Sequence, residues 1–173
     1  GRVSISYASL DNSGQTGFSS NSTVEIKNNL FMITLGTEFS FGIPASPVKP
    51  YAGIDLLFTS ISGSFDFQGS TPNGLTGGST NIESSSRTGL GLSIGSEIGF
   101  GKSVTLDLSL RYNLVNLFGK EYTVTNRNNK TDVYAYLNDA KDPAFNPSDD
   151  KHPVGSDRTI ATIQLQVGIL FGF

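Results

Sequence analysis

Residues 159–173, with the sequence TIATIQLQVGILFGF, decide the fold of this chain. Every second residue from Ile163 to Phe173 is apolar, and the residues between are polar or small, with the single exception of Leu170. Alternation with a period of two predicts a β-strand that has one apolar face and one polar face. Because chain termini in soluble domains are usually polar, we expect this apolar strand to close a sheet formed by the rest of the chain.

The same alternation recurs in five further stretches, which predict strands at residues 2–10, 24–41, 51–67, 87–100 and 104–114. The clearest is 104–114, where Leu106, Leu108 and Leu110 alternate with Asp107 and Ser109. In the third strand, the alternation of apolar and polar residues shifts by one position near residues 60–63, which predicts a β-bulge.

The segments between these strands predict two kinds of connection. Three stretches rich in Gly, Ser, Thr, Asn or Asp are expected to be long loops, at 11–22, 68–86 and 118–157. The three prolines of 42–50 and the pair Gly101–Lys102 predict tight turns. Within the longest connection, 121–136 is expected to form an exposed hairpin that turns at 126–129. This alternation of long and short connections is typical of bacterial outer-membrane barrels.

Composition narrows the function classes. The 173 residues fit one domain, 1–173, and a net charge of -3 without a basic stripe argues against nucleic-acid binding. The chain has no Cys, so it has no disulfides or thiolate metal sites. It contains no run of about 18 apolar residues, so a transmembrane helix is excluded.

The orientation of the two sheet faces separates a membrane barrel from a soluble sandwich or lipocalin-like barrel. The polar face carries many glycines, which suits the crowded inside of a narrow barrel. Its charges are sparse, and aromatic residues gather near both ends of the strands. These features favour an apolar face that points outward at lipid. The soluble alternative, with the apolar face buried, stays open.

The ending QVGILFGF (166–173) and the segment KPYAG (49–53) resemble small bacterial outer-membrane β-barrel proteins of the OmpA/OmpX-like class. The resemblance implies an all-β, antiparallel up-and-down transmembrane barrel in the outer membrane of a Gram-negative bacterium. It also implies contact with outer-membrane lipid and with the outer-membrane assembly machinery. The assembly signal would comprise Gln166, Gly168, Phe171 and Phe173.

Only six strands of membrane length are visible, whereas single-chain barrels of this kind have at least eight. We therefore expect eight strands in the complete barrel, with an N-terminal hairpin preceding residue 1. The alternative is that residues 121–125 and 132–136 belong to the wall.

Five charged residues fall on the predicted polar face, and Arg2 could lie at a similar depth. They are Glu38, Asp55, Glu97, Asp107 and Arg111. We expect a network of ion pairs inside the barrel, because buried charges persist only when they are paired. The carboxylates could instead bind a cation or tune a pore.

The remaining chemistry-bearing residues lie in the 118–157 connection. His152 is the only histidine, and we expect it to be a solvated loop residue. The lipase-like members of the resembled class pair a His with a Ser, which here could be Ser148 or Ser156, although nothing selects these serines. Five aspartates of this connection could bind calcium weakly: Asp139, Asp142, Asp149, Asp150 and Asp157. We expect a non-enzymatic barrel without metal or cofactor, with a structural role or with long outer loops that bind a surface protein or extracellular ligand. The alternatives are a narrow pore for ions or small solutes and, less favoured, a lipid-modifying enzyme.

Overall fold

The computed structural model describes residues 1–15, 22–44, 46–70, 76–100, 103–123, 134–148 and 155–171. Seven strands are formed: β1 (Arg2–Gln15), β2 (Thr23–Ser40), β3 (Val48–Ser70), β4 (Thr76–Phe100), β5 (Val104–Phe118), β6 (Tyr134–Ala135) and β7 (Ala161–Phe171). Across these described ranges, no helix has the length and apolar character needed to span a membrane.

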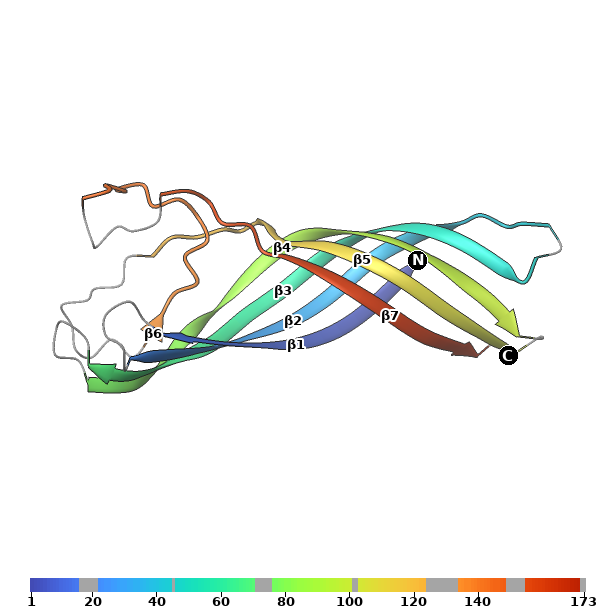
Figure 1. Ribbon diagram of the computed structural model, residues 1–173. Helices are drawn as coiled ribbons and strands as arrows, with labels where there is room; N and C mark the ends of the chain where they lie inside the picture. Colours follow the sequence, from blue (N-terminus) through green and yellow to red (C-terminus); the bar gives the residue numbers. More distant parts are fainter. Residues whose placement is uncertain are drawn as a thin grey trace.

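Six of the strands form one antiparallel sheet in the order β1-β2-β3-β4-β5-β7, and each strand pairs with its neighbour along the chain. The sheet twists and curls into an open half-barrel (Figure 1). β1 and β7 form its two edges, and no pairing joins them among the described residues. The predicted all-β, up-and-down arrangement is therefore confirmed, and the described strands leave the barrel open on one side.

The two faces of the sheet differ sharply in exposure. Apolar side chains on one face are exposed, at 59% for Leu92, 63% for Ile94 and 79% for Leu165, whereas Ser93 and Asp55 on the other face are buried. Arg2 on β1 reaches Ser93 on β4, three strands away, with its Nη2 atom 3.3 Å from the Ser93 Oγ. Side chains so far apart along a sheet meet only inside its curl. The apolar face is therefore convex and outward, as the sequence predicts.

Glycine allows the strands to curl this tightly on the inner face. A Cβ atom built on Gly36 would collide with the carboxylate of Asp55, and one on Gly95 would lie 2.5 Å from the ring of Tyr51. Neither position has room for a side chain, because the neighbouring strand's polar group occupies it. The interpretation of these glycines as a response to inner-face crowding is confirmed.

Parts of two predicted long loops are strand. β1 extends to Gln15, so that Asp11 pairs with Lys27, and β3 and β4 continue as a ladder to the pair Ser70 and Thr76. The loop predictions are therefore wrong at residues 11–15, 68–70 and 76–86, while residues 16–21 and 71–75 lie outside the described residues. These stretches carry mostly polar residues on both faces, so they lack the alternation that predicts a strand. A paired strand whose faces both contact water does not need an apolar face. The two ends of the sheet therefore differ more in how far the strands extend than in the length of the loops.

The turn predicted at 42–50 is shorter than expected, because β3 begins at Val48 and contains Pro50. The Phe41 N–H donates to the Pro50 carbonyl at 2.8 Å. Proline lacks the N–H for the return bond, and this loss falls just past the end of β2, where it costs the ladder little. The bulge predicted near 60–63 is confirmed by a register shift between Ile61 and Gly63. The turn predicted at Gly101–Lys102 lies outside the described residues.

The connection between β5 and β7 is long, and among its described residues the only strand is β6. Its described parts, residues 119–123, 134–148 and 155–160, are called the cap below. β6 within it pairs in parallel with β4 at Asn81 and Ile82 and so joins the sheet beside its main path, while residues 124–133 of the expected hairpin lie outside the described residues. The turn expected at 126–129 lies outside the described residues. The cap and β6 lie at the end of the sheet away from both chain termini (Figure 1); this end is called upper and the opposite end lower.

Candidate functional site

The lower half of the inner face carries a charge cluster centred on Arg2. Its Nη2 donates to both carboxylate oxygens of Asp55, at 2.8 and 2.7 Å, and its Nη1 pairs with Glu38. Asp55 is fully buried and Arg2 is 15% exposed. The structure thus brings together two of the five predicted charges, Glu38 on β2 and Asp55 on β3. Arg2, whose depth the sequence predicted only approximately, joins them.

The other three predicted charges lie close by on the same face but make different contacts. Asp107 accepts a hydrogen bond of 2.7 Å from the hydroxyl of Tyr51. Glu97 lies directly across the ladder from Asp107, and no ion pair involving Glu97 is found among the described residues. Arg111 is 6% exposed, and its Nε has no hydrogen-bond partner there. Whether these five residues act as one functional network remains a prediction.

The upper half of the inner face carries a cluster of buried apolar side chains. Leu30, Ile61 and Val115 from β2, β3 and β5 form a buried cluster, against which Leu137 and Ile160 of the cap pack. Val115 is completely buried. The apolar cluster therefore lies above the charge cluster on the inner face, and the cap covers the apolar cluster.

Next to this cluster lies a buried ion pair between the sheet and the cap. Arg87 on β4 donates to both carboxylate oxygens of Asp139, from Nε at 2.9 Å and from Nη2 at 2.8 Å. The two side chains are 1% and 2% exposed. Such a two-pronged geometry satisfies a guanidinium and a carboxylate together, which a buried pair requires.

Asn116 on β5 completes this site, and we call Arg87, Asn116 and Asp139 the node. The Asn116 amide nitrogen donates to Asp139 at 2.7 Å and to the Arg158 carbonyl at 2.9 Å, while its oxygen accepts from the Ile160 N–H at 2.7 Å. A single fully buried side chain thus holds two separate points of the cap against the sheet.

Electrostatics favour the ionised form of Asp139. Its burial would raise the pKa of the carboxyl, but the hydrogen bonds from Arg87, Asn116 and the Glu121 N–H outweigh this effect. The pKa of Asp139 therefore lies below its ordinary value of 3.8. The node is a charged, fully bonded contact at neutral pH.

The cap also has internal structure. Asn138 adopts a left-handed backbone with φ of 45°, and its side chain bonds both the N–H and the carbonyl of Thr123, at 2.9 and 3.1 Å. Asp157 accepts a hydrogen bond from the Lys141 N–H at 2.6 Å. These bonds hold the described parts of the cap in one arrangement and leave Tyr136 and Phe145 partly exposed.

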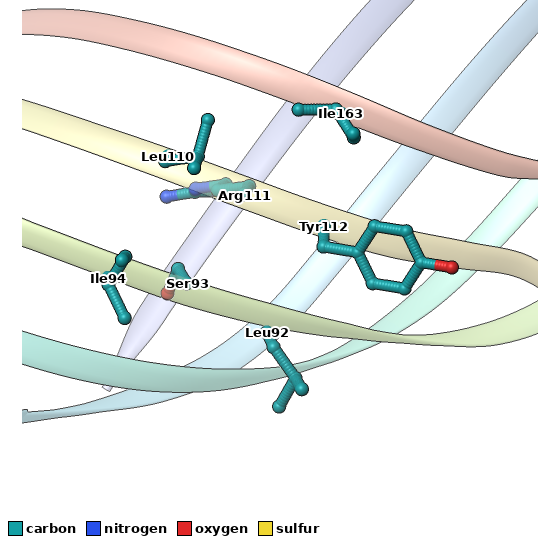
Figure 2. Close-up of a pocket in the computed structure, with 7 residues that line it drawn as sticks. All are labelled: Leu92, Ser93, Ile94, Leu110, Arg111, Tyr112 and Ile163. Carbon is teal, nitrogen blue, oxygen red and sulfur yellow. The ribbon is translucent and has the colours of Figure 1, made fainter.

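The outer face carries one shallow apolar groove of about 230 Å³ between β4, β5 and β7. Figure 2 shows Leu92 and Ile94 on β4, Leu110 and Tyr112 on β5, and Ile163 on β7 around it. Ser93 and Arg111 also border the groove, but its surface is almost entirely apolar, like the rest of the outer face.

The residues of the predicted assembly signal lie on β7. Gln166 and Gly168 face inward and Phe171 is exposed on the outer face, while Phe173 lies outside the described residues. His152 also lies outside them, and Ser148 and Ser156 are exposed on the cap. Within the described ranges, no group of three or more His, Asp or Glu could hold a metal ion.

Sequence reasoning missed the node. Arg87 is on the inward phase of its strand, in step with Gly89 and Gly91, and this signal could have marked it as a buried cation in need of a carboxylate. Nothing in the spacing selects Asp139 among the aspartates of the connection. Comparisons of the chain with models of protein families, with curated proteins and with solved structures found no match.

Proposed function

We propose that this chain is an integral β-barrel of a bacterial outer membrane, with a structural or partner-binding role. The observation that carries the proposal is the exposure of apolar side chains on the convex face of all six long strands. One apolar side chain from each strand illustrates this, with exposed fractions of 43–79%: Val3, Phe39, Phe58, Ile94, Leu110 and Leu165. Surfaces of this extent are rare on soluble monomers and mark contact with lipid or protein.

The height of this apolar surface supports the assignment. On β4 the outward apolar positions run from Leu90 to Phe100, and above them the strand carries Ser84 and Ser86. Ten residue steps span about 33 Å of strand, or about 25 Å of height at the usual tilt. This matches the apolar band of an outer-membrane barrel. The polar upper strands would then project beyond the membrane.

The arrangement above the band supports a binding role. The extended β3–β4 hairpin and the cap form structured polar surfaces at the upper end, with Tyr136 and Phe145 partly exposed. Partner recognition usually uses such segments on a rigid scaffold. The partner we propose is a surface protein or extracellular ligand.

Tryptophan quenching tests the membrane placement, because the chain contains no Trp. In vesicles of lipid brominated on the acyl chains, Leu165→Trp on the outer face of β7 should be strongly quenched. Phe145→Trp, on the cap, serves as the matched control and should not be. Equal quenching at both sites, or a freely soluble protein with Leu165 shielded in its interior, would overturn the proposal.

A narrow pore is the second candidate, favoured by the charge cluster on the lower inner face. Planar-bilayer recording decides between the two roles: ion current that changes with Asp107→Ala supports a pore, and a folded barrel without current supports the structural role.

A further inference from the structure

The upper inner face is the one part of the polar side of the sheet that needs a cover. Leu30 is 7%, Ile61 2% and Val115 0% exposed, and the side chains that cover them from the cap are Leu137 and Ile160. Without the cap, this apolar cluster would face an otherwise polar interior. The hydrophobic effect therefore drives the cap inward, onto the cluster.

The position of the cap is fixed by directional contacts as well. The Val115 N–H donates to the Ile160 carbonyl at 2.8 Å, and the Arg158 N–H donates to the Asp139 carbonyl at 2.8 Å. The first bond joins the cap to β5 beside the node. The second bond joins the Asp139 backbone to the last residues of the cap. The cap is thus bonded to β5 beside the cluster, and β6 pairs it with β4 at Asn81 and Ile82.

The node makes this closure close to all-or-none. If the cap lifted, Arg87 would be left in the sheet without its carboxylate, and Asn116 would lose its bonds to Asp139, Arg158 and Ile160. Losing one partner of a buried pair is far more costly than losing an exposed pair. Partial opening would break most of these bonds at once.

We propose that the cap is a built-in plug: Leu137 and Ile160, locked in place by Arg87, Asn116 and Asp139, close the upper end of the inner face to solutes. This proposal goes beyond the membrane assignment, because it concerns the inner face of the sheet. It applies whether lipid or water contacts the outer face. It makes the described upper interior a protein core and confines water-accessible polar groups to the lower half.

Thiol protection tests the plug, because the chain has no Cys. Val115→Cys is placed under the cap, and Ser148→Cys, exposed on the cap, reports the unprotected rate. With the full chain in detergent micelles and a small charged methanethiosulfonate, Val115→Cys should react at least about tenfold more slowly than Ser148→Cys. Equal rates in the folded protein would overturn the proposal.

Breaking the node should remove this protection. Asp139→Ala, added to Val115→Cys, should raise the labelling rate toward that of Ser148→Cys. Asp157→Ala is the matched control, since Asp157 is an exposed cap carboxylate that bonds only within the cap. Unchanged protection in the Asp139 variant, with the sheet retained by circular dichroism, would contradict the plug.

A second variant tests the plug if the sheet does not form in Asp139→Ala. Arg87→Met combined with Asp139→Leu removes both charges and keeps the volume, so the cap should stay closed and Val115→Cys protected. If this double variant also loses the sheet, the node supports the sheet itself and the plug proposal is wrong. The lipid-quenching result is independent of all these outcomes.

Discussion

Arg2, on the first strand, and Asp55, on the third, form an ion pair across the strand between them, in which the Arg2 Nη2 donates to both carboxylate oxygens, at 2.8 and 2.7 Å. Glu38 on the intervening β2 pairs with the same guanidinium. One cation thus ties three neighbouring strands together on the inside of the curl.

Replacing Asp55 should destabilise the fold strongly. Asp55→Ala leaves Arg2 partly buried with Glu38 alone, and breaking a buried pair in this way costs about 3 kcal/mol. Urea unfolding in detergent measures the loss. Glu25→Ala, which removes the exposed partner of Lys27, is the control and should leave the unfolding midpoint unchanged. Full stability of Asp55→Ala together with altered ion conductance would point to a pore lining instead.

Adding a single methyl group at Gly36 should have a similar effect for a steric reason. The new Cβ would collide with the Asp55 carboxylate and push it away from Arg2. Overpacking of this kind costs about 1–3 kcal/mol, measured as a lowered thermal midpoint. At Gly42, where an added Cβ meets nothing within 4 Å, the same substitution should be harmless. Equal midpoints for the two variants would refute this account of inner-face crowding.

The contribution of Asp139 should depend on pH. Because its pKa in the folded protein lies below the ordinary 3.8, its ionised form stabilises the fold above that pH. The stabilisation is lost as the pH falls through the folded-state value. The free energy of unfolding should therefore differ between the parent and Asp139→Asn by a constant amount above about pH 4 and by less below it. A difference that does not change with pH would show that the charge of Asp139 is not used.

Insertion should depend on Phe171 if the end of β7 is the assembly signal. Phe171→Ala should lower the fraction of protein recovered in the outer membrane several-fold, whereas Val167→Ala, also outward on β7, should have little effect. Both side chains are highly exposed, at 68% and 69%, so neither change removes a buried contact. Quantitative blotting of membrane and soluble fractions gives the answer. Equal recovery of the two variants would argue against a specific signal at Phe171.

The strands in the apolar band could be predicted well, and those outside it could not. Along β5 the alternation of Leu106, Leu108 and Leu110 with polar residues marks both the strand and its faces, because side chains of a strand alternate in direction. The upper part of β4 carries Ser, Thr and Asn on both faces, so it has no such period. Only its pairing with β3 makes it a strand.

The candidate site divides in the same way. That Glu38, Asp55 and Asp107 face inward followed from their phase in each strand. The sequence did not predict the partners of these carboxylates, because Arg2 and Tyr51 reach them across neighbouring strands. The cap was even less accessible, because the contact between Arg87 and Asp139 joins positions 52 residues apart, across a connection without a repeating pattern.

The sequence by itself determined the sheet's two faces and the antiparallel order of its strands, since both depend on local alternation and on connections between consecutive strands. The tertiary structure alone decided how far the strands extend, which charges pair and where the cap lies. These features depend on curl and on contacts between distant residues, for which the pattern of neighbouring side chains carries no information.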